Sequence, residues 1–204
     1  SDSECNIPES HHESLSDRWM DSTYQVELAT ALVKSKRYYG DALPVVYPNL
    51  GPDFYAACYG GNLIFEEETS YIEPLLDDWN YLLNLKLSKE NKYFLKMEEL
   101  YRIFLEAGKG LFYTGMPDLH PGADCLSGFR GPMNLNYDML DHPQEIEQAL
   151  KKVNADFLQF FDHYYHKLIN LSQPVTGWPG IVSDTKWHVP SNDFSCMVSH
   201  KMFI

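Results

Sequence analysis

The stretch LFYTGMPDLHPGADCLSGFRG, residues 111–131, joins a short apolar run to a polar segment rich in glycine and proline. The apolar run, 111–114, has the length and composition of a buried strand, and the polar segment is the loop that leaves its carboxyl end. That loop carries Asp118, His120 and Asp124 close together. Titratable side chains at the end of a strand are typical of a ligand site, so the residues around this loop matter most.

Two further stretches have the same pattern. ALPVVYP, 42–48, is apolar and ends in the turn-forming NLGPD, and GIVS, 180–183, precedes the polar segment 184–195. We expect both apolar runs to be strands. Between the strands, apolar residues recur at helical spacing, with capping residues or glycines at the ends. The predicted helices are 16–40, begun by Ser16 and ended by Gly40; 53–59; one within 73–87; 94–108, closed by Gly108; and 141–171, with Pro143 in the first turn and a capping box of Asp141 and Gln144.

The alternation of short strands with long helices predicts the fold class. It is typical of βα units with right-handed crossovers, so we predict an α/β fold with parallel strands. In such folds, ligands bind at the carboxyl ends of the strands. Polar residues follow all three predicted strands, in the segments 48–53, 115–124 and 188–195. We therefore predict that these three segments form one site.

Composition limits the class of partner. The chain has 204 residues, of which 44% are hydrophobic, enough for one packed domain. We expect a flexible N-terminal arm over 1–14, which lacks periodicity, and one domain over 15–204. Asp and Glu number 29 against 16 Lys and Arg, a net charge of -13, which disfavours nucleic acid and anionic membrane surfaces. No apolar segment approaches the roughly 20 residues that cross a bilayer.

Cysteine and arginine usage narrows the chemistry further. Cys5, Cys58, Cys125 and Cys196 are widely spaced and form no C-x-x-C pair. They are typical of free thiols in a reducing compartment, which predicts a cytoplasmic protein without a metal-ligand set of its own. Only four of the 16 basic residues are arginine, the side chain that binds carboxylates bidentately. A heavily carboxylated ligand would therefore be poorly served by this chain.

Four stretches taken in order resemble the uroporphyrinogen decarboxylase superfamily, which also contains corrinoid-dependent methyltransferases. GDALPVVYPNLGPDFYAACYGG is similar to the family's strand leading into an acidic turn, and YTGMPDLHPGADCLSGFRG to its G-x-P loop. DMLDHPQEIEQAL is similar to a D-x-P helix start, and SNDFSCMVSHKMF to a D-x-x-S-x-x-(I/L)-S-P-x-x-F motif. The resemblance covers 15–204 and implies part of a (β/α)8 TIM-type barrel, about strands two to four with their helices.

The chain departs from the family pattern at several positions. Asn49 stands where the decarboxylases carry an aspartate that contacts pyrrole, Asp193 where they carry a serine, and His200 where the family has proline. The decarboxylases' arginine-rich motif and the methyltransferases' zinc ligands have no counterpart here. We expect a barrel segment whose open edges are covered by self-association or by a complementary chain. Any zinc would be held by ligands from outside these 204 residues.

The resemblance implies three functions from two classes. The first is a methyltransferase-like enzyme that moves a methyl group from a small methylated substrate to a corrinoid or a thiol, inactive as this segment alone. The second is uroporphyrinogen decarboxylase, a cofactor-free lyase of tetrapyrrole biosynthesis. The third is a catalytically incomplete barrel segment with a binding or structural role. The expected partners are a small-molecule substrate and, by resemblance, a corrinoid protein or a tetrapyrrole.

The candidate site residues come from the three strand ends. His120 is the predicted general acid or base, tuned by Asp118 or Asp124, and Asp193 is the third predicted catalytic residue. The alternative is that these aspartates cap turns and a following helix. Arg130 either pairs with Asp124 or binds an anionic ligand. The predicted substrate-binding residues are Asn49, which is equally an ordinary turn residue, Asp124, Arg130, Trp187 as an apolar wall, and Ser195.

Overall fold

The computed structural model describes residues 6–75 and 77–203, so Cys5 and the first part of the predicted arm lie outside the described residues. Its helices are α1 Leu15–Met20, α2 Ser22–Ser35, α3 Phe54–Ala57, α4 Trp79–Asn84, α5 Lys92–Ala107, α6 Gly122–Arg130, α7 Pro132–Asp141, α8 Pro143–Ile169, the 3-10 helix η1 Asp193–Met197 and α9 His200–Phe203. Its strands are β1 Val45–Val46, β2 Leu63–Phe65, β3 Ser70–Ile72 and β4 Tyr113–Thr114.

The strands β1 and β4 form a parallel pair. Val45 lies opposite Tyr113 and Val46 opposite Thr114, and the crossover between them contains α5. This confirms a mixed helix-and-strand fold with a parallel sheet. Both strands are short because each leads at once into a loop: β1 into the turn at 47–53 and β4 into the segment 115–121.

The third predicted strand, 180–183, is wrong as a member of the parallel sheet. Ser183 instead forms an antiparallel bridge with Val175, because the chain reverses between them at a Gly177 to Gly180 turn. The other edge of β4 is covered by the segment before that turn. Thr114 N donates to Gln173 Oε1 at 3.1 Å, and Met116 N donates to the carbonyl oxygen of Thr176 at 2.7 Å.

An antiparallel hairpin of β2 and β3, which the pattern analysis did not identify, supports the loop after β1. Leu63 pairs with Ile72 and Phe65 with Ser70. Ser70 Oγ donates to the carbonyl oxygen of Leu50 at 2.5 Å. Gly51, with φ +92°, packs so closely here that a Cβ would lie 1.9 Å from Ser70 Oγ, so glycine is required. The hairpin thus fixes the position of the residues that follow β1.

Several predicted helices have different ends. The first is two helices, because Asp21 leaves the helical conformation and accepts hydrogen bonds from Thr23 N and Tyr24 N as the cap of α2. The pattern within 73–87 yields only the short α4. The capping box of Asp141 and Gln144 is wrong: Asp141 ends α7, and His142 precedes α8 without a side-chain cap.

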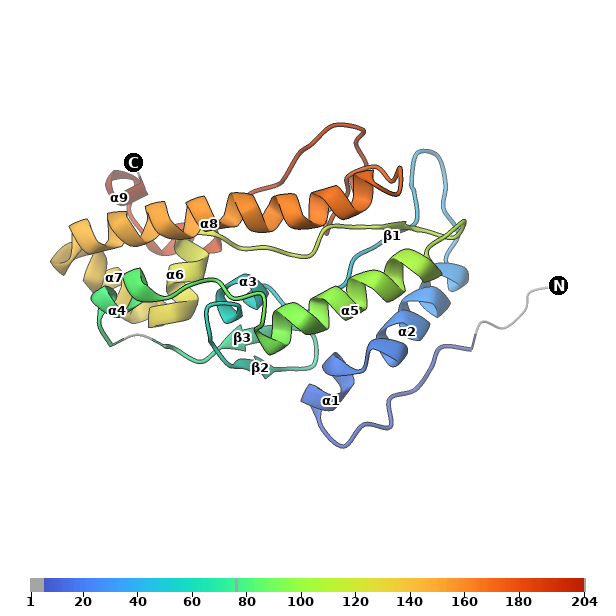
Figure 1. Ribbon diagram of the computed structural model, residues 1–204, viewed down its shortest axis with the longest axis horizontal. Coiled ribbons are helices and arrows are strands. Elements are labelled where there is room, and N and C mark those ends of the chain that lie inside the picture. The colour runs from blue at the N-terminus through green and yellow to red at the C-terminus, as the bar shows by residue number, and fades with distance from the viewer. Residues whose placement is uncertain (1–5, 76, 204) are drawn as a thin grey trace.

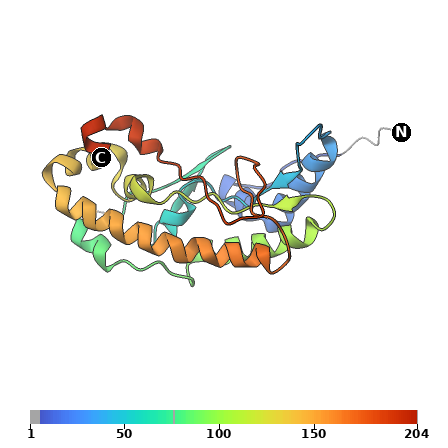
Figure 2. The same ribbon diagram turned by 90° about the horizontal axis from the view of Figure 1, so that it is seen from above.

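The core lies between α8 and the remaining elements. Figure 1 shows α8 running along the molecule above α3 and α5, with α2 beside α5. Seen from above, the chain after α8 runs back along that helix and brings η1 and α9 beside α6 and α7 (Figure 2). Tyr55, Tyr101 and Tyr164 are among the largest fully buried side chains. No helix in the described part of the chain has the length and apolar character needed to span a membrane.

The end of the predicted N-terminal arm is in contact with the domain. His12 Nε2 lies 3.0 Å from Asp21 Oδ2, and the His12 ring meets Tyr24 edge-on. Residues 6–12 carry no regular secondary structure, and Ser14 caps α1 by accepting a hydrogen bond from Asp17 N. The segment that precedes α1 is therefore attached to the domain through the His12 side chain.

Candidate functional site

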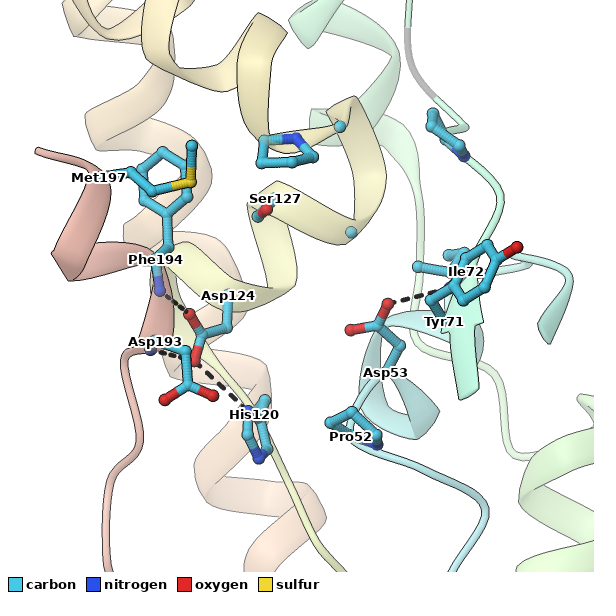
Figure 3. Close-up of a pocket in the computed structure, with 14 residues that line it drawn as sticks. Pro52, Asp53, Tyr71, Ile72, His120, Asp124, Ser127, Asp193, Phe194 and Met197 are labelled. Carbon is cyan, nitrogen blue, oxygen red and sulfur yellow. Dashed lines mark hydrogen bonds and ion pairs between the residues drawn. The ribbon is translucent and has the colours of Figure 1, made fainter. Parts of the chain in front are cut away.

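A pocket of about 530 Å³ lies where the three predicted strand-end segments meet. The turn after β1 gives Pro52 and Asp53, the segment after β4 gives His120 and leads into α6, and η1 gives Asp193. The hairpin forms part of the opposite wall (Figure 3). Residues of the three predicted segments thus line one pocket, and that this pocket is a functional site stays a prediction. The remaining lining residues are Tyr71, Ile72, Pro74, Asp124, Ser127, Gly128, Gly131, Pro132, Phe194 and Met197.

His120 is held between two carboxylates. Its Nε2 lies 3.0 Å from Asp118 Oδ1 and its Nδ1 lies 3.4 Å from Asp124 Oδ2. The side chain is 12% exposed. Burial by itself lowers the pKa, but the hydrogen bonds to Asp118 and Asp124 outweigh burial and raise the pKa of His120 to about 10. The ring is therefore an imidazolium at neutral pH, with both ring nitrogens carrying protons.

Asp124 connects two elements of this wall by hydrogen bonds. The stretch 122–130, expected to be loop, is the helix α6, and Asp124 lies in its first turn. Its two oxygens accept hydrogen bonds from Phe194 N at 2.8 Å and Asp193 N at 3.0 Å, so it joins α6 to η1. Burial raises the pKa of Asp124, but the hydrogen bonds from His120 and these two amides reverse that effect and hold the pKa below its usual range.

Asp193 reaches the same wall from a different element than predicted. It does not end a strand: it begins η1, and its Oδ1 accepts a hydrogen bond from Ser191 Oγ at 2.9 Å. Among residues 6–75 and 77–203, His120, Asp124 and Asp193 are the set of three side chains that could jointly hold a metal ion, with one ligand atom from each lying within 4.8 Å of the others. The sequence pattern predicted no metal-ligand set and did not identify this group.

Asp53 is the site residue that the pattern analysis did not single out. It lies at the N-terminus of α3, and its Oδ2 accepts a hydrogen bond from Ile72 N at 2.9 Å. Burial raises the pKa of Asp53 against the opposing effect of that hydrogen bond. Figure 3 shows its carboxylate directed across the pocket toward the wall that carries Asp124 and His120. Its position as the last residue of the polar segment 48–53 was the available signal.

Four of the five predicted substrate-binding residues, Asn49, Arg130, Trp187 and Ser195, lie outside the pocket lining. Asn49 Oδ1 accepts a hydrogen bond from Gly51 N at 2.7 Å, which is the turn role given as its alternative, and its side chain lines a separate groove beside α2. Trp187 donates from Nε1 to the carbonyl oxygen of Val175 at 3.0 Å. Ser195, in η1, is half-buried and does not line the pocket.

Arg130 pairs with a different aspartate than expected. Its Nε donates to Asp138 Oδ2 at 2.6 Å, and Trp79 Nε1 donates to the same oxygen at 2.8 Å. The predicted pair with Asp124 is wrong, because Arg130 at the end of α6 faces α7 whereas Asp124 faces η1. Arg130 therefore joins α6 to α7 and does not line the pocket.

The lining combines carboxylates with apolar walls. Among the lining residues, Asp53, Asp124 and Asp193 are acidic and His120 is the one basic side chain. Apolar surface comes from prolines and from the side chains of Tyr71, Ile72, Phe194 and Met197. Pockets of this size with few convergent polar groups are typical of small-molecule sites.

Comparisons with protein-family models, with curated proteins and with solved structures find no match to this chain. Membership of the uroporphyrinogen decarboxylase superfamily therefore stays a prediction from the four sequence stretches. The functional argument consequently depends on the geometry of the pocket.

Proposed function

We propose that this pocket is the substrate site of an enzyme in which the His120 imidazolium donates a proton to the group that leaves the substrate. The observation that carries the proposal is the Asp118–His120–Asp124 network, built into the wall of a pocket large enough for a small molecule. A histidine that is flanked by two carboxylates and faces a cavity is a typical proton donor. For the reaction we propose methyl transfer, which the resemblance to the corrinoid-dependent methyltransferases implies.

The two ring nitrogens of His120 have different parts in this proposal. The contact from Nε2 to Asp118 is the shorter, at 3.0 Å, and orients the ring. The contact from Nδ1 to Asp124 is 3.4 Å, longer than a good hydrogen bond, so a substrate atom can replace it at little cost. Asp124 remains held by Asp193 N and Phe194 N when it gives up this contact.

The proposed reaction conserves atoms and charge. The bond from the methyl carbon to a substrate nitrogen or oxygen breaks, and its electron pair stays on that heteroatom, which takes the proton from Nδ1. The methyl carbon forms its new bond to the sulfur of a thiol, and the proton that the thiol releases returns to the ring. A reduced corrinoid would supply an alternative methyl acceptor, in which case the ring would regain its proton from water. Asp118 and Asp124 stabilise the imidazolium between turnovers.

We also make a proposal about the fold that surrounds the pocket. We propose that residues 15–204 are part of a (β/α)8 barrel, a view supported by the parallel β1–β4 pair, the segment 173–177 along β4, and a pocket beyond these strand ends. The residues present do not fit the zinc site of the related methyltransferases, because neither buried thiol, Cys58 or Cys125, lines the pocket. We derive no step through zinc.

The pocket disfavours the decarboxylase alternative. Uroporphyrinogen is heavily carboxylated, and no lysine or arginine is among the lining residues, whereas three carboxylates are. Like charges placed together in a partly buried site raise the free energy of binding. A binding segment without turnover, the third alternative, is left as an outcome of the test.

The test measures demethylation. The protein is incubated with methoxylated aromatics and methylated amines, with either a free thiol or reduced corrinoid as acceptor, and both products are quantified by mass spectrometry. We expect turnover with at least one substrate and a loss of about a hundredfold in His120→Gln, the usual value of a general acid. His163→Gln, which alters a histidine paired with Glu98 on the α5–α8 interface, is the matched control and should retain activity. Absence of turnover, or equal rates in the two variants, contradicts the proposal.

A further inference from the structure

We infer that the ligand of this pocket is a small organic cation of the ammonium class, held between carboxylates on opposite walls and by aromatic faces. The inference rests on the proposed function in that it names the substrate class of the same site. Its test measures binding alone and needs no turnover.

The first argument is the balance of charge in the pocket. Asp118 and Asp124 both contact His120, so one imidazolium already faces two carboxylates. Asp193 and Asp53 form no salt bridge within the described part of the chain, although a carboxylate oxygen of Asp193 lies within 4.8 Å of a ring nitrogen of His120. The site therefore carries more negative than positive charge, and a cation would restore the balance.

The second argument is the placement of these two carboxylates. Asp193 lies on the wall formed by η1 and α6, while Asp53 lies on the opposite wall beside the hairpin (Figure 3). A ligand between them would contact both. Burial of Asp53 raises its pKa, and a bound positive charge would favour its ionised form again. This pairing also explains why a carboxylate is placed in a partly buried position with a single hydrogen-bond donor, Ile72 N.

The third argument is the shape and polarity of the remaining surface. The volume of about 530 Å³ is far larger than a bare metal ion needs and matches a small organic molecule. The exposed Tyr71 and the buried Phe194 lie on opposite sides of the pocket (Figure 3), and Ile72 and Met197 add apolar surface. Aromatic faces attract cations whose charge is spread over methyl groups, and such a ligand also buries apolar area.

The experiment compares choline with 3,3-dimethylbutan-1-ol, which has the same shape without the charge, by isothermal titration calorimetry at constant ionic strength. We expect choline to bind at least fivefold more tightly than the alcohol, since cation attraction in partly desolvated sites is of this order. Acetate should not bind. Equal affinity for the two isosteres, or no binding of choline, would overturn the inference.

Variants locate the bound charge. Asp193→Asn and Asp53→Asn should each weaken choline binding about fivefold and leave the alcohol unaffected, because each removes one carboxylate while retaining side-chain shape. Asp184→Asn, an exposed aspartate outside the lining, is the matched control and should bind choline as the wild type does. Circular dichroism melts of each variant identify any that has not folded. If neither pocket variant weakens binding while both remain folded, the inference fails.

Divalent metal is a separate outcome. Titration with magnesium or zinc alone tests whether His120, Asp124 and Asp193 hold an ion instead. Tight metal binding with no choline binding in the absence of metal would overturn the inference, whereas choline binding that competes with metal supports it. Choline binding without any demethylation would leave the inference standing and contradict the proposed reaction. Turnover confined to neutral substrates would support the proposed reaction and contradict the inference.

Discussion

Two half-buried histidines in this molecule pair with carboxylates, but the numbers of carboxylates and cationic groups differ between the two places. At the α5–α8 interface, one carboxylate serves two partners: Glu98 lies 3.0 Å from His163 Nε2 and 2.8 Å from Lys167 Nζ. In the pocket wall, one imidazole serves two carboxylates, Asp118 and Asp124. The first arrangement satisfies the carboxylate and joins two helices. The second leaves excess negative charge beside a cavity, and that imbalance distinguishes a candidate site from a structural ion pair.

The largest expected effect on stability comes from removing the fixed carboxylate of the pocket wall. Asp124→Ala leaves Asp193 N and Phe194 N without their acceptor and His120 with one carboxylate, so we expect a loss of about 3 kcal/mol in the free energy of unfolding. Urea unfolding measures it. Asp118→Ala is the matched control, since it removes only the contact with His120, and about 1 kcal/mol is expected. Equal losses in the two variants would show that Asp124 does not hold η1.

The pH dependence of stability sharpens the comparison. The pKa of His120 is raised from 6.5 to about 10, so its stabilising contribution is complete below pH 6.5 and is lost as the pH rises through 10. Relative to His120→Gln, the wild type should lose on the order of 1 kcal/mol per pH unit between pH 6.5 and 9. Urea unfolding at several pH values measures this difference. Parallel curves for wild type and His120→Gln would contradict the pairing.

A smaller effect is expected at the structural pair. Glu98→Ala removes the acceptor shared by His163 and Lys167, both of which keep partial access to water, so a loss of about 1.5 kcal/mol is expected. Glu147→Ala, which breaks the exposed pair with Lys151 on α8, should change stability less than Glu98→Ala does. Thermal melting of both variants provides the measurement. Choline binding should be unchanged in either, and a change would show that the α5–α8 interface influences the pocket.

The part of this structure that could be predicted from sequence is the part governed by local patterns. The helix 92–107 and the parallel strands at 45–46 and 113–114 follow from periodicity, and the meeting of the segments after these two strands follows from the strand-end rule. The third segment reaches the pocket through η1, which does not follow a strand. The presence of His120 at the centre followed from its position after a strand. These features depend on neighbours in sequence or on a general property of parallel sheets.

The rest depends on contacts between distant residues. Asp53 became a pocket residue because the hairpin, 19 residues later in the chain, donates Ile72 N to it. Arg130 pairs with Asp138 because the α6–α7 turn directs it there, although Asp124 is closer in sequence. The first predicted helix ends at Asp21 because the Asp21 side chain caps α2. Periodicity alone does not show whether a helix continues through such a residue or ends at it.

The hydrogen bonds from Asp193 N and Phe194 N to Asp124 join positions 69 and 70 residues apart. Everything between them, including α7, α8 and the returning segment, must be in place before that wall exists. Closing so long a loop has a high entropic cost, which places this contact late in folding. The pocket should therefore be among the last features to form during refolding, and a peptide that carries only the 111–131 loop should not reproduce it.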